Sequence, residues 1–121
     1  MQIQINSDHN IHGHEAMAQR MTADIADTLG RVSEHVTRVE VHLSIESDGK
    51  SGPADKRCLM EARIEGLQPM AVTEEAVSLD KAVHAAAGKM LRIIDATLER
   101  RRDRKHDKPT FPPASVESPD A

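Results

Sequence analysis

Hydrophobic residues recur along this chain with two different periods, and the changes of period predict its secondary structure. Alternation with a period of two predicts strands over residues 2–6, 36–46, 56–65 and, more weakly, 70–74. Apolar residues at helical spacing predict two amphipathic helices over residues 14–32 and 79–105. The predicted order of elements is therefore β-α-β-β-β-α.

The second and third predicted strands each have one apolar side. In the second, Val39, Val41, Leu43 and Ile45 alternate with Glu40, His42, Ser44 and Glu46. In the third, the inward positions are Cys58, Met60, Ala62 and Ile64. Strict alternation indicates a sheet with one buried face and one wet face. Pro69 precedes the fourth strand and cannot donate a ladder hydrogen bond, so we expect that strand at an edge.

Both predicted helices carry an apolar stripe that can cover the buried face of the sheet. The first stripe is Met17, Met21, Ile25, Leu29 and Val32, and the second is Leu79, Val83, Ala86, Ala87, Met90, Ile94 and Leu98. The expected fold is a two-layer α+β sandwich with a four-stranded sheet and two helices on one face. The side chains expected between the layers are Ile3, Ile5, Val39, Val41, Leu43, Ile45, Met60 and Ile64.

Length and composition predict one domain over residues 1–108 and a disordered Pro/Ser-rich tail over residues 109–121. With one Phe and no Trp or Tyr, the core is aliphatic, and recognition of single strands by base stacking is disfavoured. Cys58 is the only cysteine, which excludes an intramolecular disulfide and a cysteine-based zinc site. Its inward strand position predicts a buried, unreactive thiol.

The beginning of the chain has no basic segment followed by an apolar run, so it does not resemble a signal peptide. No segment approaches the roughly 20 apolar residues that cross a bilayer. We therefore expect a cytoplasmic protein without a membrane partner.

Charge is distributed unevenly, and the end of the second helix is basic. The formal net charge is -4, yet residues 100–108 hold six basic and two acidic residues, against ten and sixteen in residues 1–99. Cations favour a helix C-terminus because the helix dipole is negative there. Six cations exceed what that effect needs, so this end of the helix is a candidate contact for phosphates.

Three segments resemble the hibernation-promoting factor and protein Y family of ribosome-associated stress proteins, also described as sigma-54 modulation protein-like. Residues 9–17, HNIHGHEAM, are similar to the family's R-N-I-E-V-T-E-A-L entry into its first helix. Residues 36–43, VTRVEVHL, are similar to its long second strand. Residues 79–105 are similar to its final helix, with KMLR at 89–92 matching D-K-L-x-R-Q-L. The resemblance covers about residues 1–105.

The resemblance implies a fold similar to double-stranded-RNA-binding domains. It also implies a bacterial-type hibernation factor that binds the small ribosomal subunit, both rRNA and ribosomal proteins, and inhibits translation by occluding the messenger and transfer RNA channel. No catalysis, cofactor, metal or small-molecule substrate is expected. Duplex RNA is contacted through phosphates, which suits basic side chains. The expected RNA-binding residues are Lys89 and Arg92, then Lys81, Arg100, Arg101, Arg102, Arg104 and Lys105, and finally Arg20 and Arg31.

The sequence allows three other interpretations. His9, His12 and His14 can bind metal ions as imidazoles, but their spacing matches no common site. His42 can pair with Glu40 or Glu61 for acid–base chemistry, although alternating charges on a wet sheet face explain these residues without catalysis. The wet sheet face, or the net acidic part of the chain over residues 1–99, also suits a protein-interaction module of the same fold that does not bind the ribosome. Cations surrounded by carboxylates would favour that module, and a continuous basic patch would favour RNA.

Overall fold

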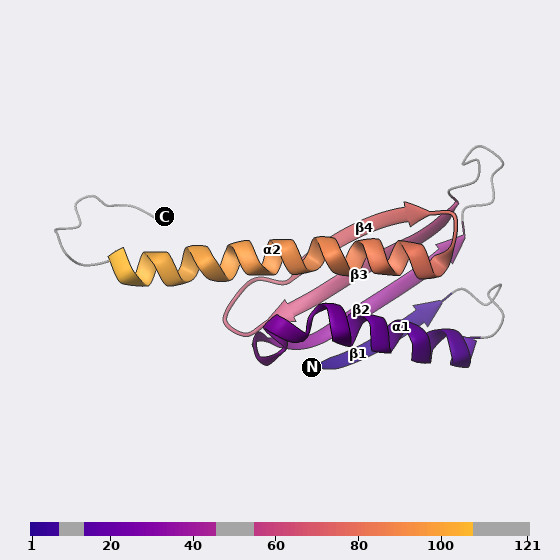
Figure 1. Ribbon diagram of the computed structural model, residues 1–121, viewed down its shortest axis with the longest axis horizontal. Helices are drawn as coiled ribbons and strands as arrows, with labels where there is room; N and C mark the ends of the chain where they lie inside the picture. The colour runs from indigo at the N-terminus through magenta and orange to yellow at the C-terminus, as the bar shows by residue number, and fades with distance from the viewer. Residues whose placement is uncertain (8–13, 46–54, 108–121) are drawn as a thin grey trace.

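The structure is a computed structural model that describes residues 1–7, 14–45 and 55–107, without the side chains of residues 104–107. Its elements are β1 (Gln2–Ser7), α1 (His14–Thr28), the 3-10 helix η1 (Gly30–His35), β2 (Val36–Ile45), β3 (Lys56–Ile64), β4 (Met70–Ala76) and α2 (Leu79–Asp107). The β-α-β-β-β-α order and the α+β class are confirmed. In Figure 1 the two helices lie side by side across one face of the sheet.

The four strands form one sheet in the order β1-β2-β3-β4. β1 runs parallel to β2, and the other neighbours are antiparallel. A parallel pair needs a crossover connection, and α1 supplies it. The register places Val41 beside Ile5 on one side and beside Met60 on the other. β4 lies at an edge, as the position of Pro69 predicts.

The core lies between the sheet and the two helices. Val39, Val41, Leu43, Met60 and Ile64 are buried there, as expected. The expectation was wrong for three isoleucines, because Ile3, Ile5 and Ile45 are only half-buried. Ile3 and Ile5 belong to an edge strand that has a neighbour on one side only. Ile45 is the last residue of β2, at the end of the sheet.

The first helix is shorter than its apolar stripe predicts. Its α-helical part ends at Thr28, and the chain continues as η1, so the predicted helix over 14–32 was too long. The Val32 amide donates to the Leu29 carbonyl, three residues back, which is the tighter 3-10 pattern. Gly30 opens this turn, consistent with the low helix propensity of glycine. Val32 is nevertheless buried, so the stripe still packs on the core.

Local signals place the remaining boundaries. The β3–β4 turn contains Gly66 at φ +79°, a conformation that a Cβ atom disfavours. β4 extends to Ala76, two residues beyond its predicted end. Ser78 caps α2 as expected, since the Lys81 amide donates to Ser78 Oγ over 3.1 Å.

Cys58 is buried in β3, as its position predicts. Desolvation raises the pKa of its thiol to about 12, with a smaller contribution from the Glu74 carboxylate. Within the described part of the chain, no helix is long and apolar enough to cross a bilayer. The expected tail, residues 109–121, lies outside the described residues.

Candidate functional site

Lys81 and Arg92 lie on the side of α2 that faces away from the sheet. Lys81 and Arg92 are both exposed, and among the described residues neither side chain has a hydrogen-bond or ion-pair partner. Eleven residues separate them, which is close to three helical turns, so they share one side of the helix about 16 Å apart along its axis. They form an outward basic stripe that is free to contact an anion.

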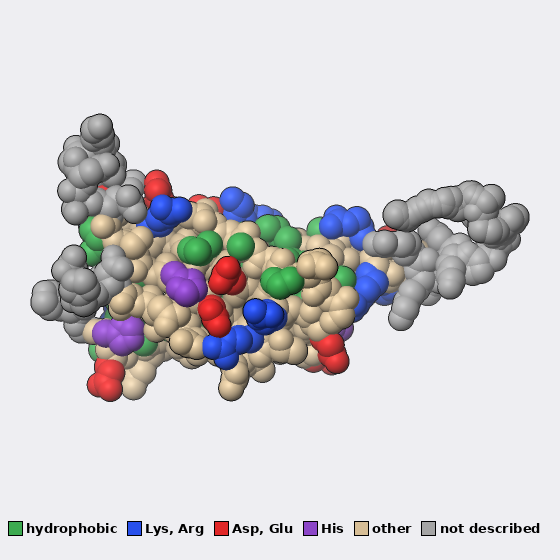
Figure 2. All heavy atoms as spheres, turned by 180° about the vertical axis from the view of Figure 1, so that it is seen from behind, with side chains coloured by type: hydrophobic (Ala, Val, Ile, Leu, Met, Phe, Trp, Pro, Cys, Tyr) green, Lys and Arg blue, Asp and Glu red, His purple; other side chains and the backbone are tan. Residues whose placement is uncertain are grey.

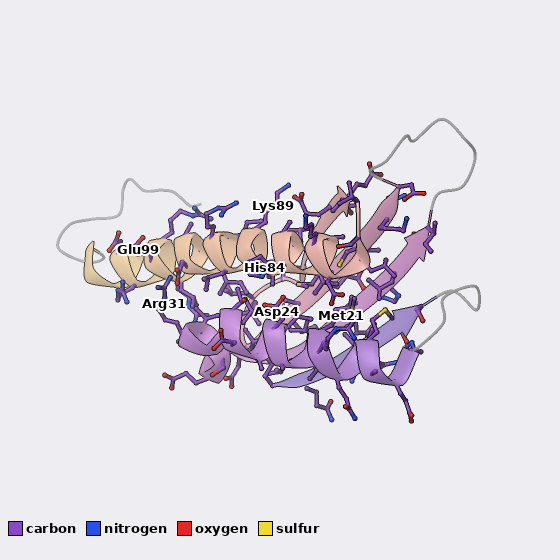
Figure 3. The ribbon with its side chains drawn as sticks, turned by 45° about the vertical axis from the view of Figure 1, so that its right-hand side comes forward. Met21, Asp24, Arg31, His84, Lys89 and Glu99 are labelled. Atoms are coloured by element: carbon purple, nitrogen blue, oxygen red, sulfur yellow. The ribbon has the colours of Figure 1, made fainter. Side chains whose placement is uncertain are left out.

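Lys89 lies on the flank of α2 that faces β4. Its Nζ is 3.2 Å from Glu74 Oε2, and 47% of the Lys89 side chain remains exposed. Figure 3 shows Lys89 pointing away from α1, on the side of the helix opposite His84. Lys89 and Arg92 are one turn apart, as expected, but the Glu74 carboxylate pairs with Lys89, whereas no carboxylate of a described residue pairs with Arg92.

Cross-helix pairs hold the basic residues of the first helical region. Arg20 Nη2 lies 2.9 Å from Asp80 Oδ2, and Arg31 pairs with Asp95. Arg31 belongs to η1, not to the first α-helix as predicted. Between these pairs, His84 Nδ1 lies 3.1 Å from Asp24 Oδ1, and Figure 3 shows the two side chains facing each other across the gap between the helices. These contacts align α1 and η1 with α2.

The last turns of α2 extend beyond the strands (Figure 1). Arg100 donates to Thr97 Oγ1 over 3.3 Å, and Arg101 donates to the Glu65 carbonyl over 3.4 Å. Arg102 is exposed and has no partner among the described residues. No carboxylate pairs with any of these three arginines within the described chain. Arg104 and Lys105 belong to the same helix, but their side chains lie outside the described residues.

A groove of about 580 Å³ separates η1 from the C-terminal half of α2. Its charged lining joins residues that are distant in sequence, and Val32 and Leu98 contribute apolar surface. The charged and titratable members are Arg31, His35, Asp95, Glu99, Arg101 and Arg102. The structure thus brings Arg31 to the arginines at the end of α2, whereas Arg20 and Lys81 lie near the other end of that helix.

No helix or strand of the described residues covers the sheet face opposite the helices. Figure 2 views this side and shows acidic, basic and histidine side chains mixed with hydrophobic ones across the strands. Near its centre, Arg38 Nε donates to Glu40 Oε2 over 2.7 Å, and this bond holds the pKa of Glu40 below its usual range. His42 Nε2 lies 3.7 Å from Glu40 Oε1 and 3.6 Å from Glu61 Oε1.

The basic residues can be recognised in the sequence, but their partners cannot. Glu74 lies beside Lys89, Asp80 beside Arg20 and Asp95 beside Arg31. The alternating or helical pattern of each element gives no sign of these contacts. Of the three histidines considered for metal binding, His9 and His12 lie outside the described residues. The third, His14, has Nδ1 2.8 Å from Ser7 Oγ.

Neither a family model nor a curated protein matches the sequence. Several solved structures share the fold, including the following two. The Thermus thermophilus protein Y N-terminal domain aligns with a TM-score of 0.64 at 19% identity, over 80% of this chain and 99% of that domain. A ribosomal subunit interface protein from Coxiella burnetii aligns with a TM-score of 0.62 at 13% identity, over 82% of this chain and 99% of that one. The resemblance inferred from the sequence is therefore confirmed at the level of the fold: this chain adopts the architecture of the protein Y N-terminal domain.

Proposed function

We propose that this chain is a ribosome-associated factor that binds structured RNA of the small ribosomal subunit and occludes the messenger and transfer RNA channel, so that translation is inhibited. The observation that carries the proposal is the gathering of cations at the end of α2, where Arg31, Arg101 and Arg102 line one groove beside two carboxylates, Asp95 and Glu99. Arg100 and Arg102 extend this surface past the sheet. The fold shared with a ribosomal subunit interface protein supports the same assignment.

The proposed contact surface is the exposed side of α2. Arg92 and Lys81 form its outward stripe, Lys89 its β4 flank, and the arginines from Arg100 onward its basic end. Guanidinium groups suit this role because they hydrogen-bond phosphate oxygens in pairs. The acidic remainder of the chain would repel RNA and so restrict the orientation of binding.

Co-sedimentation with purified ribosomes at several salt concentrations tests the proposal. The wild-type chain should bind at low salt, and affinity should fall steeply as salt rises, because each phosphate contact releases counterions. The double variant Lys89→Glu/Arg92→Glu should bind more weakly while it keeps its circular dichroism spectrum. A matched control, Arg57→Glu/Arg63→Glu, makes the same change in net charge on the open sheet face and should bind like wild type.

Equal loss in both double variants would indicate a general charge effect and would contradict the assignment to α2. Failure of the wild type to bind at low salt would contradict ribosome association itself.

A second candidate, a protein-interaction module of the same fold, is favoured by one observation. Carboxylates already pair with Arg20, Arg31 and Lys89, so the cations do not form one continuous free patch. Under this alternative, the pairs align the helices and the cations at the end of α2 serve solubility. Such a module does not bind the ribosome, so failure of the wild-type chain to co-sediment with ribosomes at low salt would favour it over RNA binding.

A further inference from the structure

The open sheet face carries a set of metal ligands on two central strands. Glu40 and His42 are two residues apart on β2 and so point to the same side. Glu61 on β3 is the direct cross-strand partner of Glu40. One ligand atom from each of the three residues lies within 4.8 Å of the other two. The backbone of the paired strands thus fixes all three side chains on one surface.

The distances fit a shared ion better than direct hydrogen bonds. His42 Nε2 is 3.7 Å from Glu40 Oε1 and 3.6 Å from Glu61 Oε1, which is too long for a hydrogen bond in either case. Two ligand atoms that each lie about 2.1 Å from one tetrahedral ion are about 3.4 Å apart. The imidazole nitrogen therefore lies near the required separation from both carboxylates, and a small rotation of each side chain would close the remaining difference.

The neighbouring residues orient the ligands. Arg38 Nε binds Glu40 Oε2, which leaves Oε1 directed toward His42. Glu40 and Glu61 also face each other across the strands, and like charges in that position repel unless a cation lies between them. Arg38 and Arg63 supply part of that compensation and oppose a further cation, so the affinity should be below that of a structural zinc site.

We propose that Glu40, His42 and Glu61 form a surface site for a divalent transition-metal ion, with Zn²⁺ the best match to one imidazole and two carboxylates. Three protein ligands leave the outward position open to water or to a group from another molecule. The site lies on the sheet face opposite α2, so it is independent of the proposed RNA contact. The mixed nitrogen and oxygen ligands also predict selection against Mg²⁺, which prefers oxygen ligands in an octahedron.

Isothermal titration of the full-length protein with Zn²⁺ tests this site. His42→Ala and Glu61→Gln should each lower the affinity of this site for Zn²⁺ by more than about tenfold. Loss of a residue that only hydrogen-bonds a metal ligand costs about tenfold or more, and loss of a ligand itself should cost at least as much. His84→Ala is the matched control, because it removes another exposed histidine beside a carboxylate and should bind like wild type. Mg²⁺ should give no comparable heat.

Nuclear magnetic resonance distinguishes Zn²⁺ binding at His42 from binding at other histidines such as His9 and His12. Zn²⁺ should shift the His42 ring resonances and the neighbouring β2 and β3 amides, and these shifts should be lost in Glu61→Gln. Zinc binding that is unchanged in both ligand variants, or shifts confined to other parts of the chain, would overturn the proposal. Ribosome co-sedimentation of His42→Ala should match wild type, so failure of the metal site and failure of the RNA proposal are distinguishable.

Discussion

The ion pair between Lys89 and Glu74 should weaken the affinity for ribosomes, an effect that the basic residues alone do not predict. To bind a phosphate, Lys89 must leave a carboxylate whose Oε2 is 3.2 Å from its Nζ. Both side chains are partly exposed, and pairs of this kind contribute about 0.2–1 kcal/mol. Releasing Lys89 by Glu74→Gln should therefore tighten ribosome binding by a factor of about 1.4 to 5 at 25 °C, if RNA contacts this flank.

Lys89 and Arg92 should contribute unequally to the affinity for ribosomes. Lys89→Gln should cost less affinity than Arg92→Gln, because part of the Lys89 contact with phosphate replaces an existing ion pair. Arg92 has no partner to lose among the described residues. The gain from Glu74→Gln should fade at high salt, where the screening length falls from about 10 Å at 0.1 M to about 3 Å at 1 M.

Glu75→Gln is the matched control, since it makes the same charge change at the next residue of β4, which points to the other side of the sheet. The assay is equilibrium co-sedimentation or fluorescence anisotropy with labelled protein and purified small subunits. The reasoning is refuted if Glu74→Gln weakens binding or if it has the same effect as Glu75→Gln. Either result would place the β4 flank of α2 outside the contact surface.

Three further predictions concern the fold. Met90→Ala should lower the free energy of unfolding by about 2–5 kcal/mol in urea titration, because Met90 is fully buried between α2 and the sheet; a loss under 1 kcal/mol would contradict this packing. Gly88→Ala should raise the free energy of unfolding by about 0.5–1 kcal/mol, because a Cβ at that mid-helix position meets nothing within 4 Å. A melting temperature below that of wild type would contradict this prediction. Cys58 should resist alkylation at pH 8 until the protein unfolds. Burial raises the pKa of this thiol from 9.0 to about 12, so the unfolded chain loses the thiol proton at a lower pH than the folded chain. The contribution of Cys58 to the free energy of unfolding should therefore be constant below pH 9 and fall between pH 9 and about 12. Alkaline denaturation of wild type and of Cys58→Ala would measure this difference.

The sequence alone determined most of the secondary structure and the layer arrangement. Strict alternation along β2 and β3 defined which side of the sheet is buried, because a shift of one residue would move Val41 and Met60 to the solvent face. The stripes of α1 and α2 required an apolar surface to cover, and Ser78 marked the start of α2. These signals are local, or they repeat with a fixed period, so they can be read without coordinates.

Tertiary structure decided which charged residues meet. The candidate RNA-binding cations were visible in the sequence, but the pairing of Arg20 with Asp80, sixty residues away, depends on how α1 lies against α2. The same is true of the groove that joins Arg31 to Arg101 and Arg102. The half-burial of Ile3 likewise follows from the edge position of β1, which its own alternation does not reveal. Periodicity specifies the face on which a side chain lies, whereas its neighbour across that face is set by the packing of separate elements.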